Sequence, residues 1–200
     1  MTSNPKINSI LDEANRLFLL GKLQEAISYY DKILEENPNH LGCLNNKGYA
    51  LSKLKDYDSA LQCYDTALKL SPNDLPVLVN KISSLRKNRD LASALSNCDR
   101  ILESNPNYNI ALYHKERILL SMKKFEASIV CCDKILEDYP KNGDVLFDKS
   151  CNLVMLSKLD EGLDNLENSI SQGMQYKIKA KKSKFFEKLN DNQRFQSLTS

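Results

Sequence analysis

Apolar and small side chains return at a fixed interval along this chain, and the interval is typical of a helical repeat. Three positions recur with a constant period of about 34 residues, and they are separated from one another by four and then three positions. They are occupied by Ala26, Tyr30 and Ile33, by Ala60, Tyr64 and Ala67, by Ala94, Cys98 and Ile101, and by Ser128, Cys132 and Ile135. Spacings of four and three put side chains on one face of an α-helix, so each copy predicts an amphipathic helix.

A proline follows each of these helices and is expected to end it, because its ring cannot continue the hydrogen-bond ladder. The prolines share the same interval and are Pro38, Pro72, Pro106 and Pro140. A second helical pattern lies upstream in each copy, and between the two patterns residues such as Asp56 can cap the next helix. Each copy therefore predicts two antiparallel helices, which can bury their apolar faces only by stacking on neighbouring copies.

The copy at residues 41–74 carries a family resemblance. Its signature consists of Leu44, Lys47, Gly48, Leu51, Ala60, Tyr64 and Pro72. This pattern resembles the tetratricopeptide repeat (TPR), whose small residue in the first helix lets the second helix approach closely. Five copies fit: 7–40, 41–74, 75–108, 109–142 and a degenerate 143–176. The resemblance covers residues 7–176 and implies an all-α fold, a right-handed superhelical solenoid of five TPR helix pairs with a C-terminal capping helix.

Some positions depart from the family pattern. Ile82 and Glu116 stand where the third and fourth copies should have a small residue, so we expect looser or shifted helix packing there. The fifth copy has Gly162 in place of the alanine and Met174 in place of the proline. These two changes are consistent with an atypical terminal repeat.

The C-terminal end of the chain is basic. Residues 177–200 contain seven Lys or Arg against Glu187 and Asp191. We expect residues 177–190 to form a basic amphipathic capping helix with an apolar stripe at Ile178, Phe185 and Leu189, and residues 191–200 to form a short turn or a frayed tail. The alternative role for the lysines is docking to an anionic surface.

Composition narrows the function classes. The chain is 42% hydrophobic and 27% charged, with a net charge of +2. Since the tail contributes +5, the rest carries about −3, which argues against nucleic-acid binding by the body of the protein. No apolar run approaches the roughly 18 residues of a membrane helix. The N-terminal residues lack the apolar segment of a signal peptide, so we expect a cytoplasmic protein.

We find no signature of catalysis, of a cofactor or of a metal site. The six glycines form no phosphate-binding loop, and neither C-x-x-C nor H-E-x-x-H occurs. His40 and His114 are expected to lie too far apart to share a metal. The cysteines are expected to be reduced, mostly buried thiols. We therefore expect no enzyme activity, no cofactor and no small-molecule substrate.

Acidic residues also recur at the same position of each second helix. They are Asp31, Asp65, Asp99 and Asp133. A row of carboxylates could indicate a catalytic site. We interpret these residues instead as an exposed outer row that pairs with basic neighbours at Lys32, Arg100 and Lys134.

The resemblance implies that the free face of the first helices lines a concave groove that holds a segment of a partner protein. The candidate groove residues are Asn15, Asn45, Asn46, Tyr49, Asn80, Ser83, Arg86, Tyr113, His114, Arg117 and Phe147. Asparagine amides can pair with both backbone groups of an extended chain, and the arginines favour a modestly acidic ligand. The alternative for this face is a solvated inner wall without a ligand.

The clamp of TPR co-chaperones, which holds a terminal carboxylate, looks disabled in this chain. Asn15 and Asn46 match its two asparagines, but Leu11, Pro76 and Asn80 stand where its three cations should be. The sequence thus predicts a non-catalytic scaffold that binds a protein segment in its groove. Two alternatives stay open: a structural or self-associating array, and an adaptor to an anionic surface or nucleic acid through the basic C-terminal helix.

Overall fold

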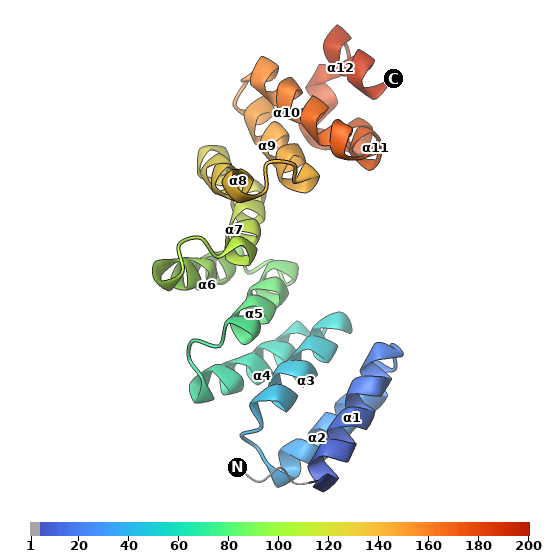
Figure 1. The fold of residues 1–200 in the computed structure, drawn as a ribbon, viewed down its shortest axis with the longest axis vertical. Helices are drawn as coiled ribbons and strands as arrows, with labels where there is room; N and C mark the ends of the chain where they lie inside the picture. Colours follow the sequence, from blue (N-terminus) through green and yellow to red (C-terminus); the bar gives the residue numbers. More distant parts are fainter. Residues whose placement is uncertain (1–4) are drawn as a thin grey trace. The chain divides into compact units, whose positions relative to one another are not determined.

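The computed structural model describes residues 5–200, and within this range the chain is helical with no β-strand (Figure 1). It contains twelve α-helices and one 3-10 helix in that range. The all-α prediction is confirmed. None of the helices in residues 5–200 is long and apolar enough to cross a membrane.

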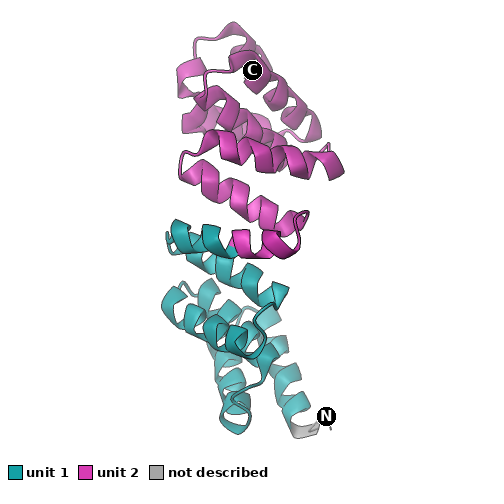
Figure 2. Cartoon of the chain, turned by 90° about the vertical axis from the view of Figure 1, so that its left-hand side faces the viewer, with its two compact units in different colours: residues 1–97 teal, residues 98–200 magenta. Residues whose placement is uncertain are grey.

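The chain divides into two compact units, residues 1–97 and residues 98–200 (Figure 2). The first, the N-terminal unit, contains α1 (Pro5–Leu19), α2 (Leu23–Glu36), α3 (Leu41–Lys53), α4 (Tyr57–Leu70) and α5 (Leu75–Lys87). Helix α6 (Leu91–Ser104) runs across the boundary. Helix α1 packs against α2 and α3 against α4, which makes consecutive helix pairs.

The second, the C-terminal unit, begins with two further helix pairs. These are α7 (Asn109–Ser121) with α8 (Phe125–Asp138), and α9 (Gly143–Met155) with α10 (Leu159–Gln172). Three short helices follow: α11 (Gln175–Lys182), the 3-10 helix η1 (Lys184–Leu189) and α12 (Gln193–Thr199).

The turn inside each helix pair has the same backbone conformation. One residue per turn adopts a positive φ, and these residues follow the repeat interval: Gly21, Lys55, Arg89, Lys123 and Ser157. In the second of these turns the N–H of Asp56 donates to the carbonyl of Leu51 and the N–H of Lys55 donates to that of Ser52, which is the Schellman pattern of helix ends. Only the first turn uses glycine, the residue best suited to this conformation.

The helices of a pair approach closely because small and large side chains face each other. A Cβ atom on Gly48 would lie 2.7 Å from Cε1 of the Tyr64 ring. In the fourth repeat the order is reversed, with Glu116 on the first helix and the smaller Cys132 on the second. Glu116 and Ile82 are both fully buried, so neither large side chain opens the packing of its helix pair to solvent.

Consecutive repeats are joined by ion pairs between a second helix and the following first helix. The pairs are Lys47 with Asp31, Lys81 with Asp65, Lys115 with Asp99, and Lys149 with Asp133, at N–O distances of 2.5 to 2.6 Å. The row of aspartates is therefore structural, as interpreted above. Its partners are lysines of the next repeat, where we expected Lys32, Arg100 and Lys134.

The C-terminal segment covers the end of α9 and α10 in a different form from the single helix that we expected over 177–190. The helix stops at Ser183, whose side chain accepts from the N–H of Phe185 at the start of η1. Residues 191–200, expected to be a turn or a frayed tail, contain α12, and its Phe195 is buried. Phe186, Leu189 and Phe195 form one apolar cluster with residues that include Leu163 and Leu166.

The expected apolar stripe is correct at Leu189 and wrong at Ile178. Leu189 is buried, whereas 57% of Ile178 is exposed. The buried side of α11 consists of Tyr176 and Ala180. Because Ile178 lies two residues from each of these, it falls on the opposite side of the helix.

Candidate functional site

Asparagine side chains link the first helices of the N-terminal unit. Asn46 Nδ2 on α3 donates to Asn15 Oδ1 on α1 at 3.1 Å, and Asn80 Nδ2 on α5 donates to Asn45 Oδ1 on α3 at 2.9 Å. Tyr30 adds its hydroxyl to Asn15 Oδ1 at 2.8 Å. Burial raises the pKa of the Tyr30 phenol, so this group is a neutral donor. We call the four amides the asparagine ladder; all four side chains are partly exposed.

The ladder keeps hydrogen-bonding capacity for a ligand. An asparagine offers two N–H donors and one carbonyl acceptor. The bonds within residues 5–200 use one N–H of Asn46 and one of Asn80, and the oxygens of Asn15 and Asn45. These bonds leave the amide oxygens of Asn46 and Asn80 and the amide N–H groups of Asn15 and Asn45 unused, and they hold each amide in place.

Two aromatic rings lie beside the ladder. The ring centroids of Phe18 on α1 and Tyr49 on α3 are 5.5 Å apart, and the Lys53 ammonium lies 5.4 Å from the centroid of Tyr49. Both rings are partly exposed. The sequence analysis missed Phe18. An available signal was its offset of 31 residues from Tyr49, which is also the offset of the bonded pair Asn15 and Asn46.

Ser83 and Arg86 continue this surface on α5, and both are partly exposed. Directly beside them, Ser84 Oγ donates to Ser52 Oγ at 2.8 Å in a fully buried contact between α5 and α3. The N-terminal unit thus brings together the seven predicted groove residues from Asn15 to Arg86. We define the first-helix face as these residues together with Phe18 and Lys53.

In the C-terminal unit the predicted residues are already engaged with each other. Tyr113 and His114 are partly exposed on α7. Arg117 lies 5.0 Å from the centroid of the Tyr113 ring, and its Nε donates to Asp148 Oδ2 on α9 at 3.1 Å. The Arg117 cation therefore has an internal carboxylate partner, and its expected attraction for an acidic ligand is largely used within the protein.

Phe147 is a correction to the predicted groove. It is only 2% exposed and belongs to the apolar cluster under the C-terminal segment. Its ring centroid lies 6.1 Å from that of Tyr176 and 5.7 Å from that of Phe186, and the Lys179 ammonium is 4.1 Å from its ring. Because α11 and η1 pack on α9, this side chain is part of the core and cannot meet a ligand.

A group of charged side chains, of which Glu116 and Asp148 are buried, lies next to Phe147. Glu116 is 0% exposed, and its Oε1 lies 3.8 Å from Arg117 Nε, while Asp148 is bonded to Arg117 as described. Lys179 reaches Asp148 at 3.9 Å and Asp144 at 3.6 Å. Burial, and then the neighbouring Asp148, raise the pKa of Glu116 to about 9. Glu116 is therefore a neutral acid near pH 7, and its side chain is not exposed to solvent.

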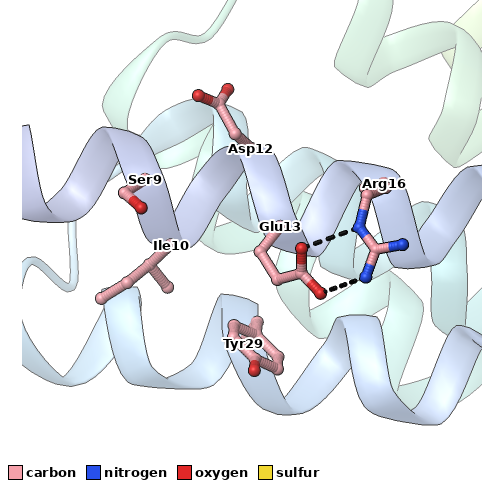
Figure 3. Close-up of a pocket in the computed structure, with 6 residues that line it drawn as sticks. All are labelled: Ser9, Ile10, Asp12, Glu13, Arg16 and Tyr29. Atoms are coloured by element: carbon pink, nitrogen blue, oxygen red, sulfur yellow. Dashed lines mark hydrogen bonds and ion pairs between the residues drawn. The ribbon is translucent and has the colours of Figure 1, made fainter.

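A shallow pocket lies between α1 and α2 (Figure 3). Glu13 and Arg16 form a two-pronged ion pair in it, with N–O distances of 2.8 and 2.6 Å, and Tyr29 lies across from them on α2. The hydrogen bond from Arg16 lowers the pKa of Glu13. The two charges satisfy each other, and the pocket contains no thiol and no imidazole.

Among residues 5–200, no three His, Cys, Asp or Glu side chains are grouped so that they could hold a metal ion. The six cysteines are free and buried. Burial raises the pKa of the Cys43 thiol to about 11 and that of the Cys132 thiol still further. Such thiols are poor nucleophiles at neutral pH.

Sequence comparison finds one matching family. A family model described as the tetratricopeptide repeat protein 21 N-terminal ARM repeat matches residues 3–129. The comparison with curated proteins gave no match.

Several solved structures are similar to the chain. A tetratricopeptide repeat protein from Parabacteroides merdae is 18% identical with a TM-score of 0.85, over 98% of this chain and 78% of that one. MamA from Desulfovibrio magneticus RS-1 is 19% identical with a TM-score of 0.79, over 91% and 100%. YrrB, described as a TPR protein with an unusual peptide-binding site, is 19% identical with a TM-score of 0.72, over 87% and 91%. At these identities the likeness is one of fold.

Proposed function

The chain belongs to the tetratricopeptide repeat family whose model matches its residues 3–129, and from this premise we propose that it is a non-catalytic scaffold that binds a segment of another protein. The observation that carries the proposal is the first-helix face of the N-terminal unit. There the asparagine ladder and two partly exposed rings, Phe18 and Tyr49, lie side by side. YrrB has a similar fold and is described as having a peptide-binding site, which supports a role in peptide binding.

The ligand that this face fits is an extended or short helical segment. Amide oxygens and N–H groups on the ladder can pair with backbone N–H and C=O groups whatever the ligand's side chains are. Aromatic rings supply contact area and lose little conformational entropy on binding. Lys53 is an exposed cation of this face, so we propose a modestly acidic ligand. Arg117 does not contribute to that preference, because Asp148 pairs with it.

Binding should be tested with peptides selected from a random library on the full chain, followed by affinity measurements on variants. Two lost amide pairs at about 0.5–1.5 kcal/mol each predict that Asn46→Ala with Asn80→Ala weakens binding roughly five- to a hundredfold. Since these two amides also bond to Asn15 and Asn45, Tyr49→Ala serves as a second test that leaves the ladder intact.

A matched control is Thr66→Ala, an exposed position on the second helix α4. Melting curves of each variant separate loss of binding from loss of structure. Selected peptides whose affinity is unchanged by the double variant and by Tyr49→Ala, both shown to be folded, would contradict the proposal.

A further inference from the structure

The outward side of α11 combines exposed apolar and basic side chains. Met174 at the N-cap and Ile178 are 63% and 57% exposed. Lys181 and Lys182, also exposed, follow Ile178 by three and four residues. Spacings of four, three and four place these side chains on one side of the helix. The opposite side, Tyr176 and Ala180, is buried in the C-terminal core.

The lysine side chains on this outward side of α11 form no ion pair with a carboxylate among the described residues. The lysine that does have partners, Lys179, is turned toward Asp144 and Asp148 and lies over the ring of Phe147. Lys177, Lys181, Lys182 and Lys184 form no ion pair within residues 5–200. We define the α11 outer surface as Met174, Lys177, Ile178, Lys181 and Lys182.

We propose that the α11 outer surface docks on an anionic lipid surface, with Ile178 and Met174 entering the headgroup region and the lysines contacting lipid phosphates and carboxylates. Clusters of lysines on a helix are attracted to anionic membranes. Apolar side chains on the same side add the burial that lets such a helix lie in the interface. A nucleic acid would satisfy the lysines alone, and it would leave two exposed apolar side chains without a partner. The apolar residues therefore favour lipid over nucleic acid.

The geometry also shows how a folded protein can present this surface. Tyr176 and Ala180 hold α11 on the core, and Lys179 adds contacts to Asp144 and Asp148. The helix therefore does not need to unfold or detach in order to bind. Such docking would be peripheral and reversible, since only two apolar side chains and a few charges take part.

The test uses the absence of tryptophan from this chain. In the full chain of 200 residues, Ile178→Trp places a single indole on the α11 outer surface, and Val130→Trp places one at a comparably exposed position on α8 (Val130 is 56% exposed). Each variant is titrated with vesicles of equimolar phosphatidylcholine and phosphatidylserine, and with vesicles of phosphatidylcholine alone. We expect the indole at 178 to shift its emission to the blue only with the anionic vesicles, and the indole at 130 not to shift.

Charge is tested by sedimentation of the native chain with the same anionic vesicles. Lys181→Ala with Lys182→Ala should weaken binding by roughly 25-fold, about fivefold per lysine, and added salt should weaken binding of the native chain. The control is Lys123→Ala with Lys124→Ala, an exposed lysine pair in the turn before α8, which should leave binding unchanged. Circular dichroism melting verifies that each variant is folded.

Absence of binding to anionic vesicles would overturn the proposal, and so would binding that is equally strong with the neutral ones. A duplex oligonucleotide provides the other arm. Tight binding to it through Lys181 and Lys182, without any emission change at position 178 on vesicles, would assign the surface to nucleic acid instead.

Discussion

Replacing Glu116 with glutamine should remove most of the pH dependence of the stability of the C-terminal unit. Glu116 is fully buried on α7, and four groups face it: Arg117 on its own helix, Cys132 on α8, Asp148 on α9 and Lys179 on α11. With Asp144, the group contains three carboxyls and two cations. Binding one proton therefore makes the net charge of the group zero. Glu116 should bind that proton, because its carboxyl is the one without exposure to water.

The sign of the effect follows from the pKa of Glu116, which is about 9 in the folded protein against an ordinary value of 4.5. Between these values the folded state keeps a proton that the unfolded state has lost. The contribution of Glu116 to the free energy of unfolding should therefore be highest below about pH 4.5. This contribution should fall as the pH rises toward 9. One proton corresponds to about 1.4 kcal/mol per pH unit, so the fall between about pH 5 and about pH 8 is of the order of 4 kcal/mol.

Glutamine has nearly the shape of the protonated acid and does not ionise. We expect Glu116→Gln to be more stable than the native chain at about pH 8 by roughly 2–4 kcal/mol, and nearly equal to it at about pH 5. The measurement is urea denaturation, followed by circular dichroism, at several pH values. The control is Glu137→Gln, at an exposed position on α8, which should leave the pH profile unchanged. Parallel pH profiles for the native chain and Glu116→Gln would refute the reasoning, and so would the absence of an infrared band from a protonated carboxyl in the native chain at neutral pH.

Three further outcomes are expected. Arg89→Gly, at an exposed residue with φ of 67°, should raise the free energy of unfolding by about 0.5–1 kcal/mol, whereas Gly21→Ala should lower it by about 1 kcal/mol. Calorimetric melting measures both effects. A destabilised Arg89→Gly variant would show that the turn at Arg89 is not strained. Removal of residues 177–200 should expose Leu163 and Leu166 and lower stability by roughly 5 kcal/mol, mainly through the loss of the large buried side chains Phe186, Leu189 and Phe195. An unchanged melting temperature would show that the segment does not act as a cap. The six buried thiols should react with a bulky thiol reagent only as fast as the protein unfolds locally, and rapid labelling of the native protein would contradict their burial.

The helix pairs were predictable because one strong signal repeats. The constant interval between copies, the spacing of small and apolar positions and the recurring prolines all indicate the same two helices. Each further copy makes an accidental match less plausible. Asp56, expected to cap α4, does accept from the N–H of Ser59 at 3.2 Å.

Packing across helices was harder to predict, because it depends on pairs of residues far apart in sequence. Glu116 occupies a position where the family pattern has a small residue, and the smaller Cys132 on the partner helix provides the room for it. Comparing Gly48 and Tyr64 with their counterparts two repeats later would have shown this exchange. The partners of the aspartate row were missed in the same way, since the lysines that bind them belong to the next repeat.

The exposure of the candidate residues was predictable where another first helix continues the same face, and it was wrong at Phe147. Asn15, Asn46 and Tyr49 lie on a surface that stays partly open. Phe147 occupies the corresponding phase of α9, but α11 and η1 cover it. Nothing in the repeat pattern specified how the last segment folds, because the helix ends at Ser183 and the segment has no repeat to align with. The exposure of Ile178 could not be predicted for the same reason, since it depends on the end of α11 at Ser183.

Binding of a protein segment to the first-helix face of the N-terminal unit is the proposal on which the function of this chain depends. The most direct measurement is a titration of the isotope-labelled full chain with a selected peptide, followed by nuclear magnetic resonance of the asparagine side-chain amides and the backbone. We expect the shift changes to gather at Asn15, Asn46, Tyr49 and Asn80, with little change on the second helices α2 and α4. Changes concentrated on α2 and α4, with the asparagine side-chain signals unmoved at saturation, would contradict it.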